Sequence, residues 1–140
     1  MTAPTAISRS STWAPEMLSV VRIISGVLFL SHGAQKLFGA LAGPEGRHPV
    51  ALVSLMGLAG VIELGGGTLI AVGLFTRAAA FLAAGEMAVA YFMVHLPNGP
   101  WPILNHGELP ILFCLIWLYL VAAGPGPWSL DAMLSRRRTV

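Results

Sequence analysis

The sequence has few charged residues and only one cysteine. Charged side chains make up 10% of the 140 residues, whereas roughly a quarter is usual in a soluble domain. The mean hydropathy is correspondingly high, at +0.77. Cys114 has no second cysteine to pair with, which excludes an intrachain disulfide and any CxxC motif for zinc, an iron–sulfur cluster or dithiol redox chemistry. We therefore expect a membrane protein with no intrinsic metal site.

Long apolar runs account for most of the chain. Its length suits four membrane-crossing helices of about 20 residues each with short connections. None of the runs has the period-two alternation of a membrane β-strand, so we predict an all-α four-helix bundle. A polar segment (1–16) precedes a single membrane domain (17–124), and a basic interfacial tail (125–140) follows it. The predicted spans are residues 17–40, 50–75, 78–96 and 107–123.

The basic residues indicate how these spans are oriented. With four crossings, Arg9, Arg77 and Arg136–Arg138 share one side, and Lys36 and Arg47 lie on the other. Lysine and arginine concentrate on the cytoplasmic side of membrane proteins, which favours cytoplasmic N and C termini in a multi-pass bacterial inner-membrane protein. We read the C-terminal arginines as this topology signal and expect no nucleic-acid partner. We also expect the first span to be retained and not cleaved as a signal peptide.

Four ionisable residues fall inside the predicted spans: Arg22, His32, Glu63 and Glu86. A charge at the bilayer centre costs from about 3 to over 10 kcal/mol, so such residues are usually paired or functional. Matching their depths predicts two pairs, Arg22 with Glu86 and His32 with Glu63. Either pair could simply fix the register of the bundle. A buried carboxylate beside a histidine can also exchange a proton near neutral pH, which makes His32 and Glu63 the candidate proton-active groups.

Other polar residues are predicted near the two surfaces. Arg77 lies near the inner surface, and Lys36 is expected to be a cation at the outer mouth of the bundle. Asn105 and Glu108 have the spacing of a capping box at the start of span four. His106 could line the same outer mouth or could simply be solvated.

Glycines recur on the faces where helices are expected to meet. Gly26 and Gly33 share one face of span one, and Gly57, Gly60 and Gly65–Gly67 lie along span two. Small residues allow helix backbones to approach closely in a membrane, where hydrophobic association is weak. We therefore expect the contacts between helices to use these small residues.

Several segments together resemble the DoxX family of small bacterial membrane proteins. They are RIISGVLFLSHGAQKLFG (22–39), ELGGG (63–67), LFTR (74–77), NHGE (105–108) and GPGPWSLD (124–131). The resemblance implies a four-helix inner-membrane protein. The family is associated with quinone-linked thiosulfate oxidation and with thiol-homeostasis complexes, and many members are labelled oxidoreductases or quinol-oxidase subunits.

Three functions are compatible with these features. The first, which we favour, is an accessory or quinone-associated subunit of a redox complex, with quinone as the possible cofactor and the electron-transfer centre on a protein partner. A haem held by His32 and His95 is a weaker variant. The second is a small proton-coupled transporter. The third is a non-catalytic scaffold that recruits soluble enzymes through the tail from Trp128 to Val140. All three place the chain in the lipid bilayer, and the substrate, the partner and any homo-oligomer stay open.

Overall fold

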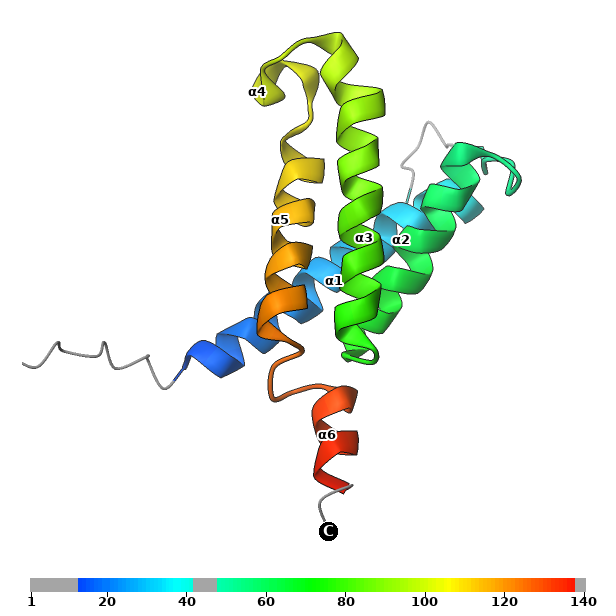
Figure 1. Cartoon of the computed structure of the whole chain (residues 1–140). Coiled ribbons are helices and arrows are strands. Elements are labelled where there is room, and N and C mark those ends of the chain that lie inside the picture. The colour runs from blue at the N-terminus through cyan, green and yellow to red at the C-terminus, as the bar shows by residue number, and fades with distance from the viewer. Residues whose placement is uncertain (1–12, 42–47, 138–140) are drawn as a thin grey trace, which may run out of the picture.

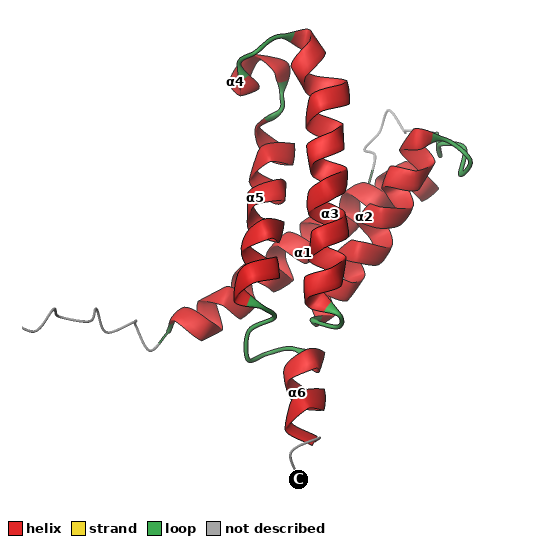
Figure 2. Ribbon diagram, in the orientation of Figure 1, coloured by secondary structure: helices red, strands yellow, loops and turns green. Residues whose placement is uncertain are grey.

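The computed structural model describes residues 13–41 and 48–137, which form helices joined by short turns (Figure 1). No strand occurs among these residues, so the all-α prediction is confirmed for this part of the chain (Figure 2). The elements are α1 (Ala14–Phe38), α2 (Leu55–Val72), α3 (Thr76–Ala90), a π-helical turn η1 (Tyr91–His95), a 3-10 turn η2 (Leu96–Asn98), α4 (Pro102–Asn105), α5 (Glu108–Ala123) and α6 (Leu130–Arg137).

The long helices form two antiparallel pairs (Figure 1). One pair is α1 with α2, and the other is α3 with α5; α2 also contacts α3, its neighbour in sequence. The two pairs cross obliquely, with α4 at one end of the molecule and α6 at the opposite end. Helices α2 and α3 meet at the turn that joins them and diverge away from it.

The small residues expected at helix contacts bring α1 and α2 into backbone contact. A Cβ atom placed on Gly67 would lie 2.5 Å from the backbone nitrogen of Leu30, and one on Gly26 would lie 2.7 Å from that of Ala71. A Cβ on Gly33 would overlap the backbone of Leu64 in the same way. Only glycine allows so close an approach, and the close approach provides the van der Waals contact that holds the pair together.

Three aromatic rings join the two helix pairs. Phe29 on α1 lies with its ring centroid 5.3 Å from that of Phe113 and 5.2 Å from that of Trp117, both on α5. Phe113 and Trp117 stack on each other at 5.5 Å. Around them, α3 contributes a buried face of small residues: Ala79, Ala80, Ala83 and Ala84. Phe29, Phe113 and Ala84 of this cluster also line the cavity described below.

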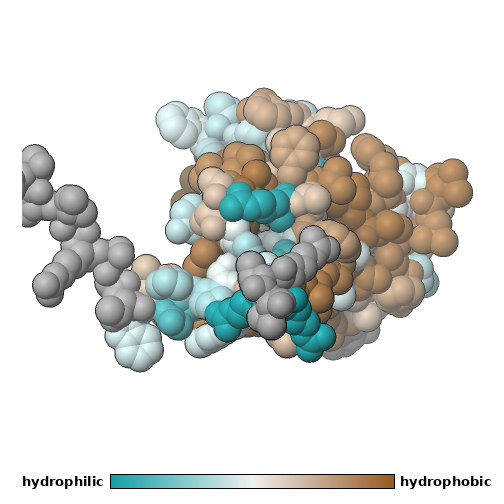
Figure 3. All heavy atoms as spheres, turned by 60° about the horizontal axis from the view of Figure 1, so that its bottom comes forward, coloured by the Kyte–Doolittle hydropathy of each residue, from teal (hydrophilic) through white to brown (hydrophobic). Residues whose placement is uncertain are grey.

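The outer surface of the helices is apolar. Three stretches are long and apolar enough to cross a membrane: Ala14–Phe38, Leu55–Val72 and Thr76–Asn98. Helix α5 is also apolar but has 16 residues, which is about 24 Å of helix against a hydrocarbon layer of about 30 Å. Apolar side chains cover much of the molecule in Figure 3, while hydrophilic ones gather near the α6 end. These features are those of a membrane protein.

The helix ends differ from the predicted spans by a few residues. Helix α2 begins at Leu55 and not at Val50, because the Ser54 hydroxyl caps it by accepting a hydrogen bond from the backbone of Gly57 at 3.0 Å. The turn predicted at Thr76 and Arg77 lies earlier, and α3 begins at Thr76. Residues 1–12, 42–47 and 138–140, which include most of the predicted polar lead, Arg9, Arg47 and Arg138, lie outside the described residues.

Candidate functional site

A cavity of about 960 Å³ lies between α1, α2, α3, η1 and α5. We call it the carboxylate cavity, after the two glutamates that face it. Most of its lining is apolar, and the aromatic ring of Phe29 contributes to it. Its polar lining residues are His32, Gln35, Lys36, His48, Glu63, Glu86, His95 and His106. The cavity thus gathers most of the ionisable side chains that the sequence places within or next to the spans.

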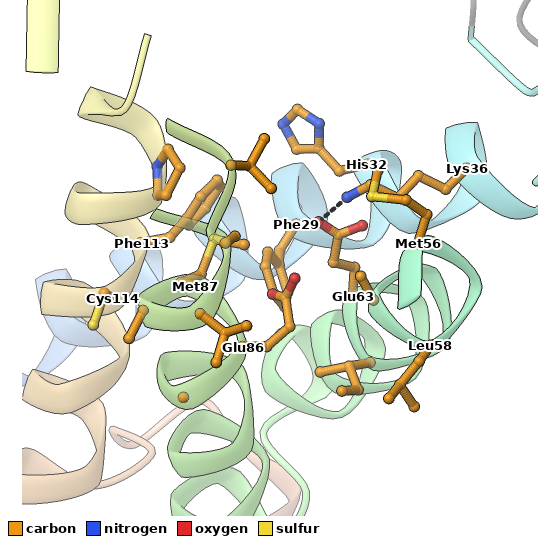
Figure 4. A pocket seen from close by; sticks show the side chains of 18 of the residues that line it. Phe29, His32, Lys36, Met56, Leu58, Glu63, Glu86, Met87, Phe113 and Cys114 are labelled. Atoms are coloured by element: carbon orange, nitrogen blue, oxygen red, sulfur yellow. Dashed lines mark hydrogen bonds and ion pairs between the residues drawn. The ribbon is translucent and has the colours of Figure 1, made fainter. Parts of the chain in front are cut away.

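Lys36 and Glu63 form an ion pair across the α1–α2 interface (Figure 4). The Lys36 ammonium donates a hydrogen bond to Glu63 Oε1 at 2.5 Å. Glu63 is almost wholly buried, with 2% of its surface exposed. Its second oxygen, Oε2, is buried without a hydrogen-bond partner in the described structure. A buried carboxylate oxygen in this state is a ready acceptor for a ligand that brings a donor.

Glu86 presents a second carboxylate to the same cavity from α3. Figure 4 shows its carboxyl group between Phe29 and Glu63. Glu86 Oε2 is also buried and has no hydrogen-bond partner among the described residues. The charges of both Glu63 and Lys36 act on Glu86. The cavity therefore contains two carboxylates and one lysine. A proton or a hydrogen-bond donor of a ligand can interact with the carboxylate that Lys36 does not bond.

The predicted pairing of His32 with Glu63 is wrong. The only hydrogen-bond partner that the described structure gives Glu63 is Lys36, which lies one helical turn beyond His32 on α1. The long lysine side chain reaches along the helix to the carboxylate. His32 still lines the cavity, and its ring meets that of Phe113 edge-on at a centroid distance of 6.3 Å. Lys36 is accordingly part of the cavity's polar centre and not only a cation at its mouth.

The predicted pairing of Arg22 with Glu86 is also wrong. Arg22 is fully buried, and its guanidinium donates hydrogen bonds to four main-chain carbonyl groups. The acceptors and distances are Ile70 (2.6 Å), Ala71 (2.6 Å), Pro125 (2.7 Å) and Trp128 (2.5 Å). The last carbonyls of a helix have no partner within it and carry partial negative charge, so the end of α2 competes well with a distant carboxylate. Arg22 is a structural clamp outside the cavity.

Arg77 repeats this arrangement at the end of α5. Its guanidinium donates hydrogen bonds to the carbonyl groups of Val121 and Ala122, the latter at 3.0 Å. The two arginines thus satisfy the C-terminal carbonyls of two different helices at the same end of the molecule. Main-chain acceptors leave no signature in a sequence, which is why neither partner set was anticipated.

Helix α6 is held against the turn between α2 and α3. The carboxylate of Asp131 accepts hydrogen bonds from the backbone N–H groups of Phe75 and Thr76, both at 2.9 Å, and its own N–H donates to the Gly73 carbonyl at 2.8 Å. Phe75 has a φ of 49°, which non-glycine residues seldom adopt. Burial raises the pKa of Asp131, but these hydrogen bonds and the charge of Arg22 outweigh it, so that the pKa is lowered overall.

The capping box predicted before span four does not form. Asn105 ends α4, and α5 begins at Glu108 after Gly107. The Asn105 side chain accepts a hydrogen bond from the Gly107 N–H at 2.8 Å and donates one to the Gly99 carbonyl at 2.6 Å, so it orders the loop. Glu108 is exposed and does not line the cavity.

Two histidines lie beside this loop at one mouth of the cavity. His95 Nδ1 lies 2.9 Å from the Asn105 carbonyl oxygen, and His106 is exposed with a φ of 58°. Both line the cavity, as does His48. Among residues 13–41 and 48–137, no group of three or more histidine, cysteine or acidic side chains is arranged to hold a metal ion.

Comparison with known proteins identifies the family. The DoxX family model matches residues 17–96. The chain belongs to the DoxX family. A Haemophilus influenzae relative named only "Uncharacterized protein" is 38% identical over 85% of this chain and 91% of its own length. "Inner membrane protein YqjF" of Escherichia coli is 28% identical over 84% and 92% of the two chains. "Putative oxidoreductase CatD" of Bacillus subtilis is 30% identical over 80% and 82%. No solved structure matches the chain.

The DoxX match covers the elements that carry the polar centre of the cavity. Lys36, Glu63 and Glu86 all lie within residues 17–96, on α1, α2 and α3. Asn105, His106 and Glu108 follow the matched region. The ion pair and the second carboxylate therefore belong to the part of the chain that defines its membership in DoxX.

Proposed function

We propose that this DoxX protein is a quinone-associated accessory subunit of a redox complex in the bacterial inner membrane, and that the carboxylate cavity binds the quinone ring. The observation that carries the proposal is the apolar cavity of about 960 Å³ that contains Lys36 and two carboxylates, each with a buried oxygen that has no partner in the described structure. Ligand sites are typically apolar cavities of this size with a few polar groups that orient the ligand.

The polar groups suit both redox states of a quinone. The Lys36 ammonium can donate a hydrogen bond to a quinone carbonyl oxygen. Glu63 Oε2 and Glu86 Oε2 can accept hydrogen bonds from the two hydroxyl groups of the quinol. Reduction consumes two electrons and two protons for each quinone, and a carboxylic acid held beside the ring can supply a proton. We assign one of the two protons to Glu86, which Lys36 does not bond directly, and the other to His32, which lines the same cavity.

The electrons must come from another subunit. The sequence has one cysteine and no CxxC pair, and Cys114 lies on α5. The proposal therefore places the flavin, haem or metal centre on a protein partner. The name of the Bacillus subtilis relative, "Putative oxidoreductase CatD", supports the redox assignment over transport.

The same proposal includes four membrane crossings with both termini in the cytoplasm. Helix α5 is the short fourth crossing, next to α3. Arg22, Arg77 and α6 then lie toward the cytoplasm, which agrees with the usual excess of positive charge on that side. His48, His95 and His106, which line the cavity, then lie toward the outer side of the membrane.

Binding of a quinone to the purified protein tests the proposal. We expect native mass spectrometry to detect one bound naphthoquinone per chain, and Glu86→Gln to weaken binding by about tenfold through the loss of one charge-assisted hydrogen bond. Glu86→Gln is the informative variant because it breaks no hydrogen bond seen in the structure. Glu108→Gln, which removes an exposed carboxylate outside the cavity, is the matched control. Absence of binding, or equal binding by both variants, would refute the proposal.

Proton-coupled transport is the second candidate, because one lysine facing two carboxylates could exchange a proton or a cationic solute. The two functions differ in a direct measurement. A transporter moves its solute into liposomes under a pH gradient, and Glu63→Gln abolishes the uptake. A quinone-binding subunit gives no uptake in either form.

A further inference from the structure

One wall of the carboxylate cavity is open to the side, between α2 and α3. Several residues of these helices line the cavity and also lie on the outer surface. Among them, Leu58 is 55% exposed, and Phe81 and Leu82 are each 64% exposed. Side chains that face both the cavity and the exterior border an opening. These residues lie on α2 and α3, which diverge away from the turn that joins them (Figure 1).

Gly85 keeps this opening clear next to the polar centre. It lines the cavity one residue before Glu86, and a Cβ atom placed on it would meet no other atom within 4 Å. Packing within the protein therefore does not explain a glycine here, in contrast to Gly67 or Gly33. Open space at this position provides a passage from the carboxylates to the exterior of the bundle.

The opening and the carboxylates together suit an amphiphilic ligand. Its small polar head would occupy the space between Lys36, Glu63 and Glu86, and its hydrocarbon chain would leave the protein past Gly85. Because lipid is as apolar as the lining of the cavity, a chain in this opening can stay in the bilayer while the head is bound. A ligand that came through the histidine-lined mouth would instead have to withdraw its chain from the membrane.

We propose that the ligand of this site is a membrane-resident quinone with a long isoprenoid tail, which enters sideways from the bilayer between α2 and α3 and keeps its tail in the opening at Gly85. This inference rests on the proposed function and adds the class of quinone and its route. It excludes tailless, water-soluble quinones as the preferred ligand. It also makes Gly85 a determinant of specificity for the tail and not for the ring.

Two probes with the same ring separate these claims. Menadione is a naphthoquinone without a tail, and menaquinone carries the same ring with a polyisoprenoid tail. Both are titrated against the wild-type protein and two variants in detergent. Gly85→Leu fills the opening. Gly65→Leu is the matched control, because Gly65 also has nothing within 4 Å of its Cβ position and does not line the cavity.

We expect Gly85→Leu to weaken menaquinone binding by tenfold or more and to change menadione binding by less than twofold, while Gly65→Leu binds both like the wild type. The lateral route is refuted if Gly85→Leu weakens the binding of both probes equally or of neither. It is also refuted if the wild type binds only menadione. In each of these cases the quinone site itself stands. If the wild type binds neither probe, the proposed function fails as well. Thermal unfolding of the three proteins checks that any loss of binding is not a loss of fold.

Discussion

The ion pair between Lys36 and Glu63 uses one oxygen of the carboxylate and leaves the other free. Lys36 bonds Oε1, and Oε2 is buried without a partner in the described structure. Lys36 therefore balances the negative charge of Glu63 but leaves one of its two oxygens without a hydrogen bond. The site can hold the Glu63 charge in the absence of a ligand, and Oε2 stays available to accept a hydrogen bond from one.

Removal of the lysine tests how far the pair stabilises the fold. Lys36→Met leaves the Glu63 carboxylate buried without its counter-ion, and we expect a loss of about 3–5 kcal/mol in the free energy of unfolding. The double variant Lys36→Met with Glu63→Gln removes both charges and should recover most of that loss. Chemical unfolding in detergent measures all three. Equal stability of the single and double variants would show that the Glu63 charge without Lys36 carries no cost.

Arg22 and Glu86 should behave as independent sites. Arg22→Lys replaces a guanidinium that bonds four carbonyl groups with a single ammonium that cannot span them, so we expect a loss of about 3 kcal/mol or more. Glu86→Gln in the same background should add its own effect to within about 0.5 kcal/mol, as is usual for residues that share no partner. A coupling energy between Arg22 and Glu86 well above that value would support the ion pair predicted from the sequence.

The sequence predicted the helices well because their signals are periodic and cumulative. Long apolar runs predicted the all-α class. The expectation that small residues mediate helix contacts holds for Gly26, Gly33 and Gly67, but it did not say which helices pair. Membership in DoxX followed from segments scattered along the chain. Helix ends were less accurate, since single hydrogen bonds such as that from Gly57 to Ser54 fix them.

The partners of the buried charges could not be predicted in the same way. His32, Glu63 and Glu86 do line one cavity, but depth matching considered only opposite charges at equal height. The long side chain of Lys36 reaches Glu63 from the next turn of α1. The carbonyl groups at the helix end bind Arg22. Side-chain reach and main-chain acceptors are properties of the folded packing, and a list of residue types does not contain them.

Substitutions of glycine on α2 should separate backbone contact from helix propensity. Gly67→Ala places a methyl group 2.5 Å from the backbone of Leu30, where neither helix can yield easily, and we expect a loss of about 1–3 kcal/mol in stability. Gly66→Ala meets nothing within 4 Å and should be neutral or stabilising by up to about 1 kcal/mol, because alanine favours helix. Thermal unfolding in detergent compares the two, and a similar loss at both positions would contradict the glycine contact.

The anchor of α6 should make this end of the molecule sensitive to acid. The pKa of Asp131 is lowered in the folded protein, so its contribution to stability is fully present above the unfolded value of about 4 and is lost as the pH falls through the folded value. Asp131→Ala removes the hydrogen bonds to Phe75 and Thr76 and should cost about 1 kcal/mol at neutral pH, by analogy with loss of a helix N-cap. Below pH 4 the variant and the wild type should converge. Limited proteolysis within α6, followed as a function of pH, measures this directly. A difference between the two proteins that persists unchanged at pH 3 would show that the Asp131 carboxylate does not hold α6 in place.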